Sequence, residues 1–229
     1  MAAGEGRRLR PVTERFAKPV LPIDGRPVIS TLLREIESAG IREVTVVTGH
    51  LAHQVERLLG DGSAFGLELR YVRQPRPEGS ADAVVRALEA GTEPPVLLTA
   101  ADTVYTPGTV AAFAEGFRRS GAAGAIAGRR GPTPTPGKPG LVIVEGRVTR
   151  VYDLDPALAL TSGPLWALGQ SLPPFLADLP GPPFELRVAY QRAIDAGFEV
   201  AGLEIGPTRD LTTPLDLILE NVPYLRALR

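Results

Sequence analysis

Apolar positions along this chain follow a helical period and a strand period in turn. Residues 27–39 carry apolar side chains three and four positions apart, which is typical of a helix buried along one face. Residues 43–48 form a short β-branched run, which is typical of a buried strand. The same alternation predicts helices at 51–59 and 80–90 and strands at 67–72 and 96–99. This order of elements indicates an α/β layer with a largely parallel sheet.

The second half of the chain is less regular. It predicts helices at 110–119, 185–196 and 214–228, strands at 122–127, 165–168 and 199–205, and a hairpin over 141–152. The hairpin is expected to turn at Glu145-Gly146, and the Pro- and Thr-rich residues 131–137 are expected to form an extended, exposed loop. Ligands of an open α/β sheet bind beyond the carboxyl ends of its strands, so chemistry is expected after Thr48, Val72 and Thr99.

Composition narrows the possible functions. The 229 residues are 44% hydrophobic, which suits one domain with a large core. Lys and Arg total 25 against 26 Asp and Glu, so the basic excess of a nucleic-acid-binding protein is absent. Without cysteine there can be no disulfide or thiolate site, and with only His50 and His53 a histidine-based triad or zinc site is not expected. Lys18 and Lys138 are the only lysines, so Lys18 needs an explanation.

The sequence shows no signal for a membrane or for export. No apolar run is long enough to span a bilayer, and the N-terminus lacks the apolar stretch of a signal peptide. We therefore expect a cytoplasmic protein without a membrane partner.

The N-terminal residues have the composition of a phosphate-binding loop. Gly4-Glu5-Gly6 would let backbone amides approach a phosphate, and Arg7, Arg8 and Arg10 supply guanidinium groups suited to bidentate contacts. A flexible, basic N-terminus is the alternative. A dinucleotide fingerprint is excluded because Leu9 stands at its third glycine, and no GxxxxGK[ST] occurs.

The residues that follow extend this motif. The chain reads Gly-x-Gly-x-Arg-Leu-x-Pro-x-Thr from Gly4 and Lys-Pro-x-x-Pro from Lys18, followed by a short turn and Pro27. This pattern resembles the nucleotidyltransferase family of sugar-1-phosphate nucleotidylyltransferases, such as the glucose-1-phosphate thymidylyl- and uridylyltransferases and the mannose-1-phosphate guanylyltransferases. The resemblance implies one Rossmann-like, three-layer domain over 1–229 with a mixed, mostly parallel sheet. Its nucleotide-binding half would span about 1–120 and its acceptor-binding half about 121–229.

The same resemblance assigns the phosphate site. It implies that the loop of Ala3, Gly4 and Gly6 wraps the triphosphate, and that Arg8 and Lys18 are catalytic cations. In-line displacement at phosphorus depends mainly on such positioned charge.

Two aspartates are the candidate metal ligands. Asp102 follows the strand at 96–99, and a carboxylate there suits Mg²⁺, although a turn or helix-capping role is the alternative. Asp210 resembles the late aspartate of the family, although Thr212 replaces the usual glycine and Arg209 stands where an aromatic residue is common. Asp216 is interpreted as a helix-surface residue.

Base and acceptor recognition are assigned by looser matches. Gln74, Gly79 and Ser80 resemble the base-reading loop, with Ser80 as the expected N-cap and an exposed strand-end amide as the alternative for Gln74. Gly140 and Gly163 resemble acceptor-site glycines against which a sugar ring could lie. Glu185 could accept sugar hydroxyls or simply favour a helix start.

Three positions depart from the family pattern. The glycine loop normally follows a full apolar strand, whereas this sequence starts at Met1-Ala2-Ala3. The usual Glu-Lys-Pro motif is replaced by Asp153-Leu154-Asp155-Pro156, which has no lysine to bind the acceptor phosphate. Ala17 replaces the proline that commonly precedes the lysine.

The reaction predicted is Mg²⁺-dependent transfer of a nucleotidyl group from a nucleoside triphosphate to a sugar-1-phosphate, with release of pyrophosphate. The missing lysine leaves three alternatives open: a different acceptor, substitution by Arg150, or loss of activity. A cytidylyltransferase for a non-sugar phosphate and a non-catalytic nucleotide-binding relative are therefore the rival interpretations. The base, the acceptor and the oligomeric state, a homo-oligomer included, are not fixed by the sequence.

Overall fold

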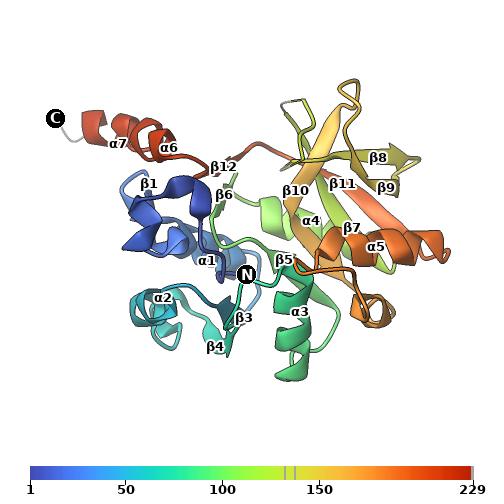
Figure 1. Cartoon of the computed structure of the whole chain (residues 1–229), viewed down its shortest axis with the longest axis horizontal. Helices are drawn as coiled ribbons and strands as arrows, with labels where there is room; N and C mark the ends of the chain where they lie inside the picture. Colours follow the sequence, from blue (N-terminus) through green and yellow to red (C-terminus); the bar gives the residue numbers. More distant parts are fainter. Residues whose placement is uncertain (132, 137, 228–229) are drawn as a thin grey trace. The chain divides into compact units, whose positions relative to one another are not determined.

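The computed structural model describes residues 1–131, 133–136 and 138–227. The chain divides into two compact units that interleave along the sequence (Figure 1). Unit 1 comprises Met1–Pro77, Ala100–Gly108 and Thr208–Arg229, and unit 2 comprises Glu78–Thr99 and Thr109–Pro207. Pro132 and Gly137 of the expected 131–137 loop, and Leu228 of the expected last helix, lie outside the described residues.

The parallel strands β3 (Glu43–Thr48) and β4 (Glu68–Arg73) form one layer of unit 1. Their register pairs Thr48 with Arg73, so both carboxyl ends meet at one edge. Ala2 bridges Thr48 at this edge. Helices α1 (Val28–Ser38) and α2 (Ala52–Leu59) belong to the same unit, and each buries the apolar stripe that the sequence predicted.

Unit 1 also contains short antiparallel ladders and short helices. The ladders are β1 (Pro22–Ile23) with β2 (Arg26–Pro27) and β6 (Thr103–Tyr105) with β12 (Thr208–Asp210). The 3-10 helices are η1 (Arg7–Leu9), η2 (Val12–Glu14), η3 (Lys18–Val20) and η4 (Ser63–Phe65). Leu9, Ile23 and Leu211 bury their side chains in one core cluster, which joins the N-terminal turn, the hairpin and the end of β12.

The end of the chain differs from the single helix expected over 214–228. Two helices form instead, α6 (Pro214–Leu219) and α7 (Val222–Ala227). Asn221 lies at the break, where its side-chain amide donates to the carbonyls of Pro22 and Leu217. Pro223 lacks the N–H that a continuous helix would use there, so one uninterrupted helix is disfavoured.

A six-stranded sheet in the order β5-β10-β7-β11-β9-β8 forms the centre of unit 2. Its strands are β5 (Val96–Thr99), β7 (Gly124–Arg130), β8 (Gly140–Val144), β9 (Arg147–Asp153), β10 (Leu160–Leu168) and β11 (Val200–Ile205). Only β7 and β11 pair in parallel within it. The mixed α/β character is confirmed. The expectation of a mostly parallel sheet is wrong for the described ladders, because β10 runs against both neighbours and β8–β9 is a hairpin.

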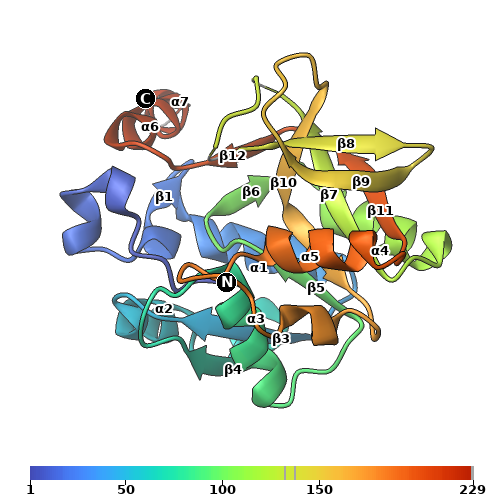
Figure 2. The same cartoon turned by 45° about the vertical axis from the view of Figure 1, so that its right-hand side comes forward.

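The helices of unit 2 are α3 (Ser80–Glu89), α4 (Thr109–Ser120), η5 (Pro173–Leu176) and α5 (Leu186–Asp195). Figure 2 shows α5 in front of the sheet. The ring of Tyr190, in α5, packs edge to face against the ring of Trp166, with 4.8 Å between the ring centroids. The Tyr190 hydroxyl donates to the Ala167 carbonyl at 2.7 Å. Burial raises the pKa of Tyr190, so the phenol stays protonated as a donor. Within the described part of the chain, no helix is long and apolar enough to cross a bilayer.

Two local expectations need correction. Ser80 is the first residue of α3, and Gly79 is the N-cap with a φ of 112°. The Ser80 hydroxyl instead accepts the Leu186 backbone N–H at 2.9 Å. Asp216 is not merely a surface residue, because its carboxylate accepts the backbone N–H groups of Thr212 and Thr213 at 2.7 and 2.6 Å. It therefore caps α6 at its N-terminus.

Substitution of Gly79 tests the close approach at the start of α3. A Cβ at Gly79 would lie 2.3 Å from the Phe184 carbonyl oxygen, whereas a Cβ at Gly91 would meet nothing within 4 Å. Both glycines have positive φ, 112° and 91°, so Gly91→Ala controls for backbone strain alone. We expect Gly79→Ala to lower the free energy of unfolding by about 2 kcal/mol more than Gly91→Ala, measured by urea denaturation. Equal losses would contradict the contact with Phe184.

The hydrogen bonds of the Asp216 carboxylate predict that the stability of the fold depends on pH. Hydrogen bonds from the backbone of Thr213 and Thr212 lower the pKa of Asp216 below its ordinary value of 3.8. The ionised carboxylate therefore stabilises the fold above that value, and the contribution is lost as pH falls through the lowered pKa. We expect Asp216→Ala to cost about 1 kcal/mol at pH 7. The gap between variant and parent should shrink in denaturation curves below about pH 4, and a gap independent of pH would contradict the cap.

Candidate functional site

The β6–β12 ladder brings the two candidate metal ligands into one neighbourhood of unit 1. Asp210 pairs with Thr103, the residue after Asp102, although 210 − 102 = 108 positions separate the two aspartates. Directly opposed residues of an antiparallel pair have Cβ atoms about 5 Å apart, so Asp210 lies next to Thr103, one residue along the chain from Asp102. The Thr212 hydroxyl donates to Asp210 Oδ1 at 3.0 Å, which fixes one oxygen of that carboxylate.

Lys18 forms an ion pair with the first of these aspartates. Its Nζ donates to Asp102 Oδ2, and the two side chains are only 17% and 24% exposed. Water screens charges less at this burial than at the surface, so the attraction is stronger than that of an exposed pair. The lysine that the sequence singled out therefore lies directly at the candidate metal ligand.

The carboxylates of Asp102 and Asp210 suit Mg²⁺ rather than zinc. Among the described residues, no group of three or more His, Cys, Asp or Glu side chains is placed to hold a metal ion. A zinc site would need such a group, whereas Mg²⁺ commonly binds one or two carboxylates and completes its shell with phosphate oxygens and water. The donor set of Asp102 and Asp210 therefore fits Mg²⁺ in the presence of a phosphate ligand.

The glycine loop is held at both ends. The Ala3 carbonyl accepts the His50 backbone N–H at 3.2 Å, and the Gly6 carbonyl accepts the buried Thr13 hydroxyl at 2.9 Å. Gly6 has a φ of 62°, and a Cβ there would lie 2.9 Å from Thr13 Cγ2. Gly4 has open space on its Cα. The loop is thus fixed at Ala3 and Gly6 and accessible between them.

The three arginines of this turn are in different situations. Arg7 and Arg10 face Glu5 at 2.7 and 3.6 Å, and the hydrogen bond from Arg7 lowers the pKa of Glu5. Arg8 is exposed on η1 and has no carboxylate partner among the residues that the structure describes. Arg8 is therefore the arginine of this turn that is available to an anion.

Gln74 follows β4 in unit 1 and is only 4% exposed. Its backbone N–H donates to the Thr48 carbonyl at 2.8 Å, which ties it to the end of β3. The alternative of an exposed strand-end amide is therefore wrong. Its role in reading a base stays a prediction.

The other candidate binding residues lie in unit 2. Two segments pair there, because Phe184 donates its N–H to Glu78 at 2.7 Å and accepts from Ala81 at 2.9 Å. Gly79 sits between these bonds, and the Ser80 hydroxyl contacts Glu185 Oε2 at 3.2 Å. A candidate nucleotide-binding residue thus touches a candidate acceptor-binding residue.

Gly140 and Gly163 are buried in the sheet of unit 2. A Cβ at Gly140 would lie 2.6 Å from Leu158 Cδ1, and one at Gly163 would lie 3.0 Å from the Ala127 carbonyl oxygen. Protein atoms therefore explain why both positions are glycine. A sugar-binding role for these two glycines stays a prediction.

The segment from Arg150 to Pro156, which lacks the expected lysine, is held by hydrogen bonds to the Asp153 carboxylate. Asp153 accepts the Asp155 N–H at 2.9 Å and the Arg150 guanidinium at 2.7 Å. These bonds, the backbone one first, lower the pKa of Asp153. Arg150 is therefore engaged by Asp153, which weakens the interpretation that it replaces the missing lysine.

Two groups of residues were missed by the sequence interpretation. Arg209, noted only as a departure, forms hydrogen bonds with Asp24 and Glu220 and so ties β12 to the β1–β2 hairpin and α6. Its partners are 185 and 11 positions away, so no local spacing signals the cluster. His50, which was considered from the sequence only as a candidate for a triad or zinc site, and Gln54 hold the backbone between Thr13 and Ala17.

Comparison with known proteins agrees with this arrangement. The family model described as nucleotidyl transferase matches residues 1–154. A glucose-1-phosphate thymidylyltransferase of Streptomyces antibioticus is 42% identical over 87 residues, which are 38% of this chain and 24% of that protein. An N-acetylmuramate alpha-1-phosphate uridylyltransferase of Neisseria meningitidis serogroup B is 35% identical over 116 residues, 49% of each chain. The chain therefore spans between a quarter and half of the length of these curated relatives.

Solved structures show the same fold. An apo UDP-glucose pyrophosphorylase superposes with a TM-score of 0.80 at 18% identity, covering 100% of this chain and 97% of its own. The inositol-1-phosphate CTP transferase from T. maritima gives a TM-score of 0.80 at 17% identity, covering 94% and 88%. The family match spans well over half of the sequence and includes the glycine loop, Lys18 and Asp102. This chain belongs to the nucleotidyl transferase family.

Proposed function

We propose that this chain transfers a nucleotidyl group from a nucleoside triphosphate to a sugar-1-phosphate and releases pyrophosphate. The observation that carries the proposal is the ion pair of Lys18 with Asp102. The β6–β12 ladder places Asp210 opposite Thr103, the residue after Asp102. A cation paired with a carboxylate, in the unit that also contains the glycine loop and Asp210, suits the charge balance of phosphoryl chemistry. Relatives named as thymidylyl- and uridylyltransferases support the same reaction.

The candidate site residues of unit 1 would have different roles in nucleotidyl transfer. The loop of Ala3, Gly4 and Gly6 would hold the triphosphate through backbone amides, and Arg8 and Lys18 would neutralise charge that develops around the α-phosphorus. Asp102 and Asp210 would hold Mg²⁺, which when bound would neutralise phosphate oxygens. A phosphate oxygen of the acceptor would attack the α-phosphorus, and pyrophosphate would leave from the opposite side.

Recognition of the two substrates is assigned to the residues that the sequence singled out. Gln74, Gly79 and Ser80 are proposed to contact the nucleotide, and Gly140, Gly163 and Glu185 the acceptor. The three-layer, Rossmann-like arrangement stays a prediction that the likeness to solved nucleotidyltransferases supports. The cytoplasmic location likewise stays a prediction.

One observation favours a second candidate, a cytidylyltransferase for a non-sugar phosphate. The segment from Arg150 to Pro156 holds two aspartates and no lysine, and its arginine is paired with Asp153. Carboxylates at this segment would suit an acceptor that carries a cation beside its phosphate, as an amino-alcohol phosphate does. Pyrophosphate release from each common triphosphate, measured with sugar-1-phosphates and with alditol, inositol and amino-alcohol phosphates, decides between the two acceptors.

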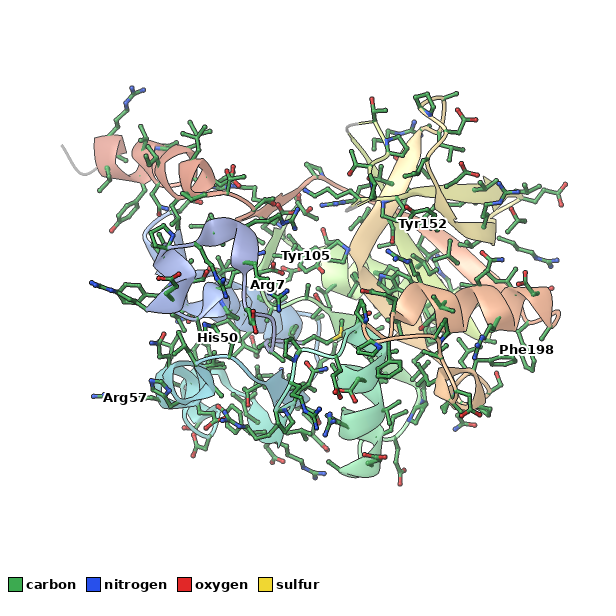
Figure 3. All side chains as sticks on the ribbon, viewed as in Figure 1. Arg7, His50, Arg57, Tyr105, Tyr152 and Phe198 are labelled. Carbon is green, nitrogen blue, oxygen red and sulfur yellow. The ribbon has the colours of Figure 1, made fainter. Side chains whose placement is uncertain are left out.

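Removal of the charge of Lys18 or Asp102 should strongly lower turnover while the fold persists. We expect Lys18→Met and Asp102→Asn each to lower kcat for pyrophosphate release by roughly 100- to 1,000-fold, the loss typical of one electrostatic contact to a transition state. Arg57→Met is the matched control, because Arg57 is exposed and Figure 3 shows it pointing away from α2 into solvent.

Two outcomes would overturn this proposal. Activity that survives both substitutions would remove Lys18 and Asp102 from the reaction. Triphosphate binding without pyrophosphate release, for every acceptor and with Mg²⁺ present, would instead indicate a non-catalytic nucleotide-binding protein.

A further inference from the structure

The backbone from Thr13 to Ala17 is held by two side chains from consecutive segments, the turn after β3 and α2. His50, in the turn after β3, contacts the Thr13 carbonyl through Nε2 at 2.7 Å. Gln54, in α2, makes two hydrogen bonds to the residues just before Lys18. Figure 3 shows His50 in the same region of unit 1 as Arg7 of the N-terminal turn. No role for His50 or Gln54 follows from the reaction as proposed above.

Gln54 fixes the backbone on which Lys18 depends. Its Oε1 accepts the Ala17 N–H at 2.8 Å, and its Nε2 donates to the Arg15 carbonyl at 2.7 Å. The orientation of the amide is determined, because an N–H can only donate and a carbonyl can only accept. Ala17 is 1% exposed, so losing this partner would leave a buried amide unsatisfied.

The side chain of Ala17 does not fix its own backbone φ. Ala17 has a φ of −60° and a ψ of 135° at the residue before η3, which starts at Lys18. A proline ring would lock such a φ covalently, whereas alanine is held only by its packing and its hydrogen bonds. The direction of the Lys18 side chain toward Asp102 therefore depends on the hydrogen bonds of Gln54.

His50 fixes the glycine loop rather than the lysine. Its Nε2 must carry the proton, because the Thr13 carbonyl accepts. Thr13 in turn donates its hydroxyl to Gly6 at 2.9 Å, and the His50 backbone N–H binds Ala3 at 3.2 Å. One residue thus holds both ends of the loop, the first end directly and the second through Thr13.

We propose that His50 and Gln54 are positioning residues for nucleotidyl transfer, a role that rests on the function proposed above. Gln54 sets the place of the Lys18 ammonium group, and His50 sets the shape of the loop that receives the triphosphate. Both residues would act through the backbone, which their side chains contact at Thr13, Arg15 and Ala17.

This division predicts two different kinetic effects. Lys18 is assigned to charge that develops during the reaction, so Gln54→Met should lower kcat by roughly 10- to 100-fold and change the KM for triphosphate little. The loop binds phosphates before and during the reaction, so His50→Phe should mainly raise the KM for triphosphate, by about tenfold.

His53→Ala is the matched control, because His53 is exposed on α2, the helix that also carries Gln54. This substitution should leave kcat and KM unchanged. Conservative variants test the hydrogen bonds themselves. His50→Gln keeps a donor and should restore most of the KM. Gln54→Glu keeps the acceptor for Ala17 but not the donor to Arg15, so its kcat should fall between those of the parent and Gln54→Met.

Hydrogen exchange provides a measurement that does not depend on activity. The Ala17 amide should exchange at least about tenfold faster in Gln54→Met than in the parent or in His53→Ala, because its acceptor is gone. Unchanged exchange at Ala17 would overturn the proposal. So would faster exchange with an unchanged kcat, because the contact would then hold structure without positioning Lys18.

The two proposals can fail separately. If the parent protein releases no pyrophosphate from any triphosphate, the proposed function fails, and with it the catalytic role of both residues. The exchange of Ala17 would then still show whether Gln54 holds this backbone. If the parent is active and the Gln54 and His50 variants show the same decrease in kcat and the same increase in KM, the two residues do not have the separate roles proposed here.

Discussion

The register of one short ladder determines how the two candidate metal ligands of unit 1 are placed along the backbone. The three pairs of β6 and β12 place Asp210 opposite Thr103, the residue after Asp102. A shift of one residue would turn the Asp210 side chain to the other face of the strand and bring Arg209 into its place. The register is anchored on the other face, where the Arg209 guanidinium contacts the carboxylates of Asp24 and Glu220. Lys18 completes the site because its own segment is held against α2.

Local periodicity was sufficient for the elements that bury one face. The predicted strands at 43–48 and 96–99 match β3 and β5, and the predicted helices differ from α1 and α2 by one residue at their ends. Lys18 could also be singled out from the sequence, because Lys18 and Lys138 are the only lysines, and its ion pair with Asp102 gives it a definite place in the structure. These features depend on neighbours in sequence, and sequence alone describes such neighbours well.

Features that depend on distant partners could not be predicted. Parallel and antiparallel pairing look alike within one strand, so β10 could not be assigned its direction from residues 165–168. Ser80 has the residue type of an N-cap, but the approach of Phe184 requires the adjacent glycine at that position. The bonds of Gln54 to Arg15 and Ala17 span 39 and 37 positions, and no periodicity relates them.

The pairing of residues 78–81 with 184–186 has a consequence for how such a protein can diverge. Gly79 and Ser80 belong to the candidate nucleotide loop, and Glu185 belongs to the candidate acceptor site, yet backbone hydrogen bonds and the Ser80–Glu185 contact join them. A mutation that reshapes one segment must be accommodated by the other, because Gly79 leaves no space beside the Phe184 backbone. If these residues serve donor and acceptor as proposed, the two preferences would not be traits on which selection can act independently. Lineages that change one are expected to carry compensating changes in the other.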